Sequence, residues 1–169
     1  TGAWAGLHGG TTSASLLGVR AVLDRFTTLY FYHTQDGGGV CDRNQFDTGV
    51  TPAQTVEKLV PHAMKKWGKK VYVIAADYNY GQITSQWVKK YVTENGGEVP
   101  AIDFFPLDVT NFGPTISKIQ AAKPDFVWSA LVGGAHISFY RQSAAAGLRN
   151  GIPTAATTSA LGNSPTVLS

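Results

Sequence analysis

The sequence predicts an α/β protein built on a Rossmann-like, flavodoxin-like parallel sheet with helices on both faces. Two continuous apolar runs of strand length, residues 71–76 and 126–132, are typical of parallel strands that helices cover on both sides. Helical patterns separate these runs, and the predicted strands start about 27 residues apart, which is the spacing of β-α units. This alternation is what predicts the fold class.

The first 50 residues hold one β-α-β unit. Its predicted strands are residues 3–7 and 29–32, and its helix covers residues 13–26, where apolar residues recur at helical spacing. Residues 33–50 carry Gly, Asp and Asn without periodicity, so we expect a long connection there. One such unit is too small to close a sheet of its own. It either joins the following sheet or belongs to a lobe of which part is absent from this chain.

A second helix is predicted from Pro52 to Trp67. Thr51 and Gln54 have the spacing of a capping box, and proline is favoured at the first helical position. Gly68 follows the last apolar residue of the pattern and ends the helix.

The remaining elements continue the alternation of strands and helices. Glycine pairs or prolines separate them, as at Gly96-Gly97 and Pro124. The predicted strands are residues 71–76, 99–105, 126–132 and 152–156, and the apolar stripes of the intervening helices run through residues 83–91, 112–119 and 133–140.

Composition excludes several classes of protein. The chain has 169 residues, of which 43% are hydrophobic, so it can bury a core without disulfides or metals. The single cysteine, Cys41, leaves no internal disulfide framework and argues against a structural zinc site. The formal charge is +3, but the densest basic patch, residues 65–70, lies at a predicted helix end, where cations complement the helix dipole. We therefore expect no nucleic-acid partner.

Aromatic and hydroxyl side chains follow the predicted strands, where ligands bind in an open parallel sheet. One such segment is the loop of residues 77–80, which carries two tyrosines after the strand 71–76. Hydroxyl groups both donate and accept hydrogen bonds, and phenol rings exclude water, so this set suits a small neutral polar ligand such as an amide or urea. The candidate ligand-binding residues are Ser13, Tyr32, Thr34, Asp77, Tyr78, Tyr80, Thr157 and Thr158.

Catalytic and cofactor sites are not predicted. Ser13, His33 and Asp77 can be written as a triad, but no G-x-S-x-G elbow exposes a nucleophile. No pair of histidines has metal-ligand spacing, and no phosphate-binding glycine motif occurs. We expect no enzymatic activity, no metal and no cofactor.

Two long stretches of the sequence resemble a known family. They are YFYHTQDGGGVCDRNQFDTGVTPAQTVEKLVPHAMKKWGKKVYVIAADYNYGQIT and FFPLDVTNFGPTISKIQAAKPDFVWSALVGGAHISFYRQ. Both are similar to type 1 periplasmic binding proteins, and more closely to the solute receptors of ABC transporters that bind urea and short-chain amides. The resemblance covers nearly the whole chain.

The resemblance implies roles for the strand-end residues. Family members have two Rossmann-like lobes that clamp a ligand between them. Their pocket uses a serine and a Tyr-x-Thr in the first lobe, and a Tyr-x-Tyr and a threonine-rich turn in the second. The matching positions here are Ser13, Tyr32 and Thr34, then Tyr78 and Tyr80, then Thr157 and Thr158. The chain departs from the family at Thr11 and Leu16, where members usually carry an aromatic residue and an arginine.

By the same resemblance, residues 1–47 are a partial β-α-β unit of lobe one with a crossover, and residues 48–169 are the second lobe. The implied function is recognition of urea or a short-chain amide for an ABC transporter, with a membrane permease as partner. The implied location is periplasmic or extracellular, with a cytoplasmic amide sensor as the alternative. Two other functions stay open. One is branched-chain amino-acid binding, with Asp77 taking the ammonium group. The other is a truncated lobe that serves in assembly or protein interaction and self-associates.

Overall fold

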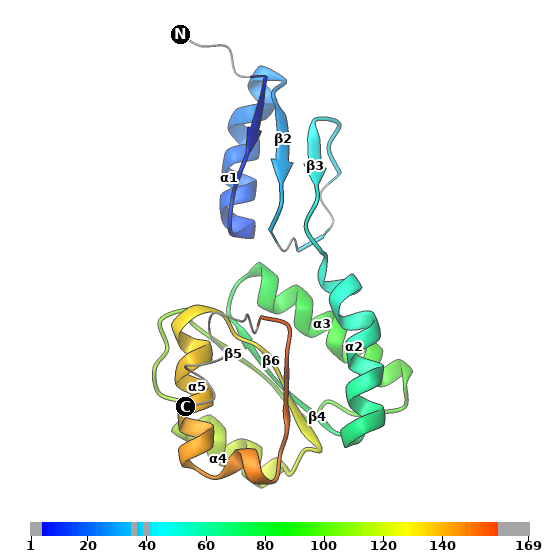
Figure 1. The fold of residues 1–169 in the computed structure, drawn as a ribbon, viewed down its shortest axis with the longest axis vertical. Coiled ribbons are helices and arrows are strands. Elements are labelled where there is room, and N and C mark those ends of the chain that lie inside the picture. Colours follow the sequence, from blue (N-terminus) through cyan, green and yellow to red (C-terminus); the bar gives the residue numbers. More distant parts are fainter. Residues whose placement is uncertain (1–4, 35–36, 39–40, 159–169) are drawn as a thin grey trace. The chain divides into compact units, whose positions relative to one another are not determined.

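The computed structural model describes residues 5–34, 37–38 and 41–158. The chain forms two compact units, Thr1–Thr55 and Val56–Ser169 (Figure 1). Each unit has a parallel sheet of its own, so the first β-α-β unit does not join the sheet that follows it. The expectation that this unit is too small for its own sheet is wrong, because a third strand, Gln45–Asp47, pairs with it.

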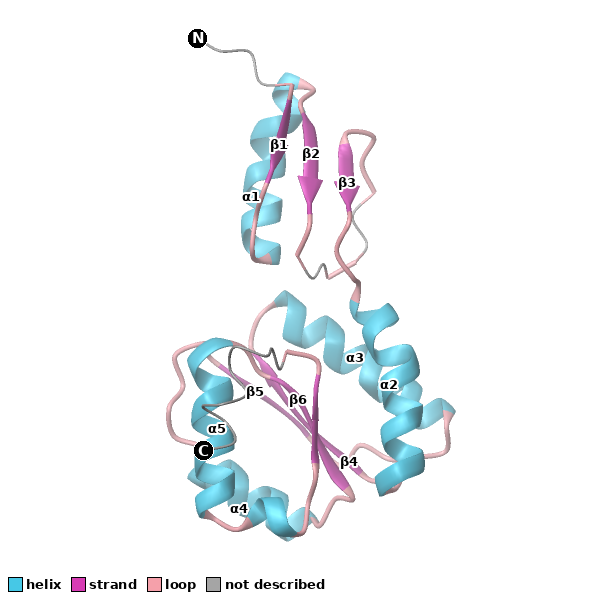
Figure 2. Ribbon diagram, in the orientation of Figure 1, coloured by secondary structure: helices cyan, strands magenta, loops and turns pink. Residues whose placement is uncertain are grey.

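The N-terminal unit is a three-stranded sheet with one long helix. Its strands lie in the order β1-β2-β3, and all three arrows run in the same direction (Figure 2). A small cluster of buried residues, Leu16, Tyr30 and Tyr32, joins the helix to the sheet. The elements are β1 (Gly6–His8), α1 (Ser13–Leu23), the 3-10 turn η1 (Asp24–Phe26), β2 (Leu29–Tyr32) and β3 (Gln45–Asp47).

Two features of this unit differ from the prediction. Strand β3 lies inside the segment that was expected to be a connection, where Phe46 pairs with Phe31 and their ring centroids are 5.1 Å apart. A strand of three residues is too short to show periodicity, which is why the sequence pattern does not reveal it. The predicted helix 13–26 tightens into a 3-10 turn for its last three residues and ends at Thr27, whose φ is 51°.

The C-terminal unit is a four-stranded parallel sheet with the strand order β5-β4-β6-β7. Strand β4 pairs with β5 on one side and with β6 on the other. In the described part of the chain, no helix combines the length and apolar character needed to cross a bilayer. The elements are α2 (Pro52–Trp67), β4 (Val71–Ala76), α3 (Asn79–Glu94), β5 (Ile102–Phe105), α4 (Gly113–Ala122), β6 (Phe126–Ala130), α5 (Gly133–Ala145), the 3-10 turn η2 (Leu148–Asn150) and β7 (Thr154–Ala156).

Helices cover both faces of this sheet. Alternate residues of a strand point to opposite faces, so Val73 and Trp128 pack against α2 and α3, whereas Tyr72 and Val127 pack against α4 and α5. Figure 1 shows these two pairs of helices on opposite sides of the sheet. The predicted fold class, a parallel sheet between two helical layers, is therefore confirmed.

The predicted capping box at the start of α2 is present. The backbone N–H of Thr51 donates to Oε1 of Gln54 at 2.8 Å, and the backbone N–H of Gln54 donates to Oγ1 of Thr51 at 3.4 Å. These bonds satisfy N–H groups that a helix start leaves without an intrahelical partner.

Helix α3 begins closer to strand β4 than the sequence pattern indicates. Its first residue is Asn79, so Tyr80 lies in the first helical turn and not in a loop. Gly81 allows this tight junction, because a Cβ atom at that position would overlap the carbonyl oxygen of Ala76.

Candidate functional site

The carboxyl edge of the C-terminal sheet carries five of the predicted ligand-binding residues. Asp77 and Tyr78 follow β4 directly, and Tyr80 lies in the first turn of α3. Thr157 and Thr158 follow β7. Strand β4 is also where the chain changes its direction of travel across the sheet, since β5 and β6 lie on its two sides. Parallel sheets bind ligands beside such a switch point. We refer to Asp77, Tyr78, Tyr80, Thr157 and Thr158 as the edge cluster.

Tyr80 is the anchor of the edge cluster. Its ring is buried, with 5% of its surface exposed, and its phenol oxygen lies 3.0 Å from Oγ1 of Thr157. Burial raises the pKa of the Tyr80 phenol, an effect that the hydrogen bond to Thr157 offsets only in part. The hydroxyl pair is therefore neutral, and it joins α3 to the chain that leaves β7.

Tyr78 and Asp77 form the more open part of the edge cluster. The half-buried ring of Tyr78 lies with its centroid 6.0 Å from that of Tyr80. Asp77 is exposed, and its Oδ1 accepts a hydrogen bond of 3.1 Å from Nε2 of Gln82. The backbone N–H of Asp77 donates to the carbonyl of Phe105 at 2.7 Å, which fixes this segment to the end of β5.

Thr158 contacts the backbone of Leu131 and the side chain of His136, a residue that the sequence analysis did not select as a site residue. Its hydroxyl donates to the carbonyl oxygen of Leu131 at 2.6 Å, and its Oγ1 lies 3.5 Å from Nδ1 of His136. His136 is buried, with 1% of its surface exposed, and its ring centroid lies 4.7 Å from that of Tyr140. Burial lowers the pKa of His136, so the imidazole is neutral at physiological pH.

His136 could have been found from one signal in the sequence. Gly133-Gly134 marks a helix start, and His136 and Tyr140 are four residues apart, which places them on one face of that helix. The sequence contains no metal-ligand spacing around His136, so the histidine pattern alone does not indicate a role for it. Within the described residues, no three His, Cys, Asp or Glu side chains gather into a group that could hold a metal ion.

The three other predicted site residues belong to the N-terminal unit. Thr34 follows β2, and its hydroxyl donates to the carbonyl of Gly10 at 3.3 Å. Ser13 is the first residue of α1, directly after the N-cap Thr12, and its side chain lies outside the described part of the structure. Tyr32 has 0% of its surface exposed, so its ring packs in the core and offers no surface to a ligand.

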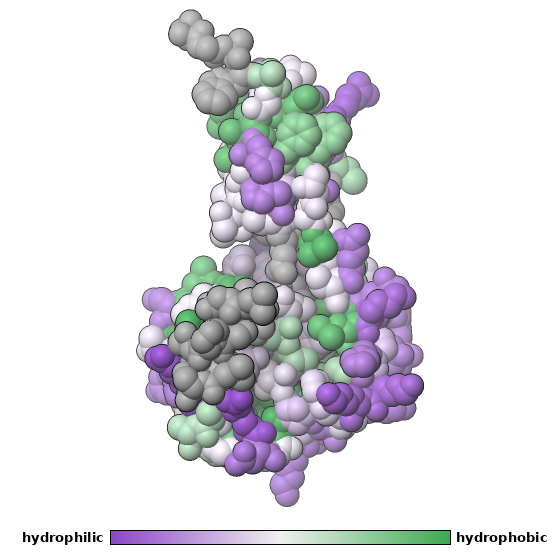
Figure 3. Space-filling view, viewed as in Figure 1, coloured by the Kyte–Doolittle hydropathy of each residue, from purple (hydrophilic) through white to green (hydrophobic). Residues whose placement is uncertain are grey.

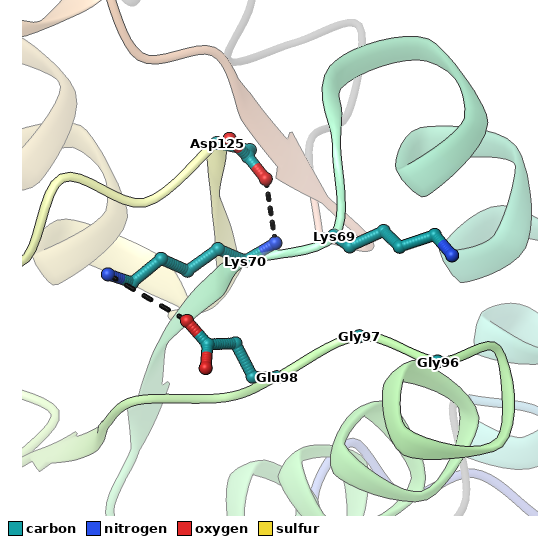
Figure 4. Close-up of a pocket in the computed structure, with 6 residues that line it drawn as sticks. All are labelled: Lys69, Lys70, Gly96, Gly97, Glu98 and Asp125. Atoms are coloured by element: carbon teal, nitrogen blue, oxygen red, sulfur yellow. Dashed lines mark hydrogen bonds and ion pairs between the residues drawn. The ribbon is translucent and has the colours of Figure 1, made fainter.

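A hollow of about 360 Å³ lies at the opposite, amino-terminal edge of the C-terminal sheet (Figure 4). Both of its carboxylates pair with Lys70. Oδ2 of Asp125 accepts from the backbone N–H of Lys70 at 2.8 Å, and Nζ of Lys70 lies 3.8 Å from Oε1 of Glu98. Figure 4 shows the Lys69 side chain pointing away from both carboxylates. These pairs brace the strand starts, and parallel sheets do not bind ligands at that edge.

Comparison with known proteins gives one family and a set of solved structures. The sequence profile of the family described as periplasmic binding protein matches residues 3–167. A solute-binding protein of an ABC transporter from R. palustris, solved in complex with benzoate, is similar with a TM-score of 0.79 and 23% identity. That match covers 90% of this chain and 43% of the other.

Two further solved structures are similar to the same extent. A periplasmic binding protein from Burkholderia mallei has a TM-score of 0.79 and 21% identity, over 88% of this chain and 41% of the other. A branched-chain amino-acid ABC transporter periplasmic ligand-binding protein from Burkholderia xenovorans has a TM-score of 0.80 and 17% identity, over 95% and 44%. The chain thus spans less than half the length of these proteins, and at such identities they share its fold.

Proposed function

The chain belongs to the periplasmic binding protein family, and from this we propose that it acts in solute capture for an ABC transporter and leaves its ligand chemically unchanged. The similar solved structures that are solute-binding proteins of ABC transporters support this role. The edge cluster is the part of the C-terminal unit that we assign to ligand contact.

We propose a small, neutral, polar ligand such as urea, formamide or acetamide. The observation that carries this is the neutral hydroxyl pair of Tyr80 and Thr157, 3.0 Å apart and flanked by the Tyr78 ring. Hydroxyl groups pair with both the carbonyl and the NH2 groups of an amide. The five residues of the edge cluster include no cationic side chain, and burial keeps the neighbouring His136 neutral, so none of these six described side chains offers a counter-charge to a carboxylate.

Calorimetric titration tests this ligand class. The chain is titrated with urea, formamide and acetamide, and with benzoate as an anionic comparison. We expect heat with at least one amide and none with benzoate. Tyr78→Ala should weaken amide binding about tenfold, because it removes the ring that excludes water from the hydroxyl pair, whereas Tyr78→Phe keeps the ring and should retain affinity. Absence of heat with all three neutral ligands would remove the proposal.

A second candidate ligand is a branched-chain amino acid. The exposed carboxylate of Asp77 favours it, since a carboxylate at this edge can pair with an ammonium group. One similar structure is a branched-chain amino-acid ligand-binding protein, which supports including this class. Competition by leucine or valine, with loss of that competition in Asp77→Asn, would select the amino acid over the amides.

The proposed partner is the membrane permease of an ABC transporter, and the proposed location is the periplasm or the cell exterior. Membership of the periplasmic binding protein family supports both. Release of the native protein from its cells by osmotic shock would agree with a periplasmic location. Retention with the cytoplasmic fraction would instead favour the cytoplasmic amide sensor.

A role in assembly is the alternative that one observation favours. Phe26 and Phe46 of the N-terminal unit are 73% and 46% exposed, and Figure 3 shows hydrophobic side chains gathered on this unit. Exposed apolar side chains favour association with another surface. Light scattering distinguishes the two roles: a stable oligomer that dissociates in Phe46→Ser favours assembly, and a monomer at all concentrations argues against it.

A further inference from the structure

Two consecutive threonines leave strand β7 and bond in different directions. Thr157 pairs with Tyr80 of α3, and Thr158 pairs with the carbonyl of Leu131 at the end of β6. Both residues lie in the bend that follows β7, and their hydroxyls reach different elements, Tyr80 of α3 and the backbone at the end of β6. Two hydrogen bonds, one to α3 and one to the end of β6, therefore hold the segment after β7 in place.

On the α5 side, Thr158 and His136 share one hydrogen-bond acceptor, the carbonyl of Leu131. The carbonyl oxygen of Leu131 accepts the Thr158 hydroxyl at 2.6 Å, and it is also a hydrogen-bond partner of the His136 imidazole. The single proton of the Thr158 hydroxyl is used in its bond to Leu131. Oγ1 of Thr158 is thereby left as an acceptor for an Nδ1–H of His136, whose Nδ1 lies 3.5 Å away.

His136 has little freedom to leave this position. The ring is buried, and the ring of Tyr140 lies against it one helical turn further along α5. Gly133, with φ of 60°, lets the chain turn from β6 into α5 so that His136 falls in the first turn, beside Leu131. His136 is thus a fixed residue that contacts the segment after β6 and the segment after β7, so it can set how these two segments lie relative to each other.

We propose that His136 is a positioning residue of the ligand site: it holds Thr158 against Leu131 and thereby sets where Thr157 meets Tyr80. The proposal rests on the proposed function, because its main consequence is ligand affinity. His136 acts through the two threonines and needs no contact with the ligand itself.

The test uses the full chain and three substitutions. His136→Leu removes the N–H donor, His136→Asn keeps an N–H donor near the Nδ1 position, and Thr158→Val removes the hydroxyl without changing the side-chain shape. His62→Leu, at an exposed histidine of α2, is the matched control. Amide affinity is measured by calorimetry, and the backbone amide signals of Thr157 and Thr158 are followed by NMR.

We expect His136→Leu to weaken amide binding about tenfold and to shift both threonine signals. His136→Asn should restore most of the amide affinity and bring the threonine signals most of the way back to their wild-type positions. In the Thr158→Val background, His136→Leu should add little, because both changes break the same link. The control should bind like the wild type.

Three outcomes would overturn the proposal. They are unchanged threonine signals in His136→Leu, shifted signals with unchanged affinity, and a His136→Asn variant as weak as His136→Leu. If the wild type binds no amide, the proposed function fails, and the NMR signals with their rescue by asparagine still decide whether His136 positions the threonines.

Discussion

The phenol oxygen of Tyr80 lies 3.0 Å from the hydroxyl oxygen of Thr157, although 77 positions separate the two residues in the chain. Their contact exists because β4 and β7 are parallel strands of one sheet with β6 between them, so that the segments that leave their carboxyl ends converge. The hydroxyl pair therefore joins the first β-α unit of this sheet to its last strand.

Tyr80→Phe should lower both stability and ligand affinity. The substitution keeps the buried ring and removes one hydrogen bond, so we expect a loss of about 1 kcal/mol in the free energy of unfolding. Urea denaturation measures this change, and calorimetry measures the affinity. Tyr91→Phe is the control, because Tyr91 is a half-buried tyrosine of the same helix, α3, outside the edge cluster. Equal effects of the two substitutions would show that the Tyr80 hydroxyl has no special role.

Two glycines in first helical turns should respond in opposite ways to alanine. Gly81→Ala places a Cβ atom against the carbonyl of Ala76 and should destabilise the chain by about 2 kcal/mol or more, since backbone has to move. At Gly134 in α5, an added Cβ would meet no atom of the described residues within 4 Å, apart from its chain neighbours and the backbone of its own helix. Gly134→Ala should therefore be neutral or stabilise by up to about 1 kcal/mol, through helix propensity. Urea denaturation compares the pair, and a stable Gly81→Ala variant would contradict the tight junction.

His136 should make stability fall as the pH is lowered. Burial holds the pKa of His136 in the folded chain below its ordinary value, so the unfolded chain binds the proton first when the pH drops below about 6.5. The contribution is fully present above that pH and decreases until the lowered folded-state pKa is reached. The other three histidines are present in both the wild type and His136→Asn, so their pH-dependent contributions to the free energy of unfolding cancel when the two proteins are compared.

The measurement is the free energy of unfolding of both proteins at pH 7.5, 6.5 and 5.5. The advantage of the wild type over His136→Asn should shrink as the pH falls. An advantage that stays constant or grows would mean that burial does not disfavour the charged imidazole.

The sheet of the C-terminal unit could be predicted because its strands are buried on both faces. Residues 71–76 read as an unbroken apolar run, and the structure places strand β4 at those residues. The start of α2 could be predicted as well, because Thr51 and Gln54 satisfy local N–H groups and need no tertiary contact.

The rest depends on contacts that sequence spacing does not encode. Whether a tyrosine at the end of a strand faces a ligand or the core is decided by packing, and Tyr32, the last residue of β2, packs into the core with Leu16. His136 acquires its place only when the segments after β6 and β7 meet. Strand β3 exists through its pairing with β2, not through a pattern of its own.

Fragments of the chain test where the C-terminal domain begins. The buried clusters around Trp128 and Tyr72 contain only residues of the C-terminal unit, so residues 48–169 should fold without the remainder. Residues 1–47 hold a far smaller buried cluster, and we expect no cooperative unfolding from them.

The starting residue of the C-terminal fragment should matter. A fragment of residues 48–169 keeps the Thr51–Gln54 capping box, whereas residues 56–169, the compact unit itself, lack the first turn of α2. We expect the shorter fragment to be less stable by about 1–2 kcal/mol in urea denaturation followed by circular dichroism. Equal urea midpoints for the two fragments would show that the domain does not need the capping box and can begin at residue 56. The predicted boundary at residue 48 requires the longer fragment to be the more stable one, because the cap satisfies N–H groups that would otherwise begin the helix unpaired.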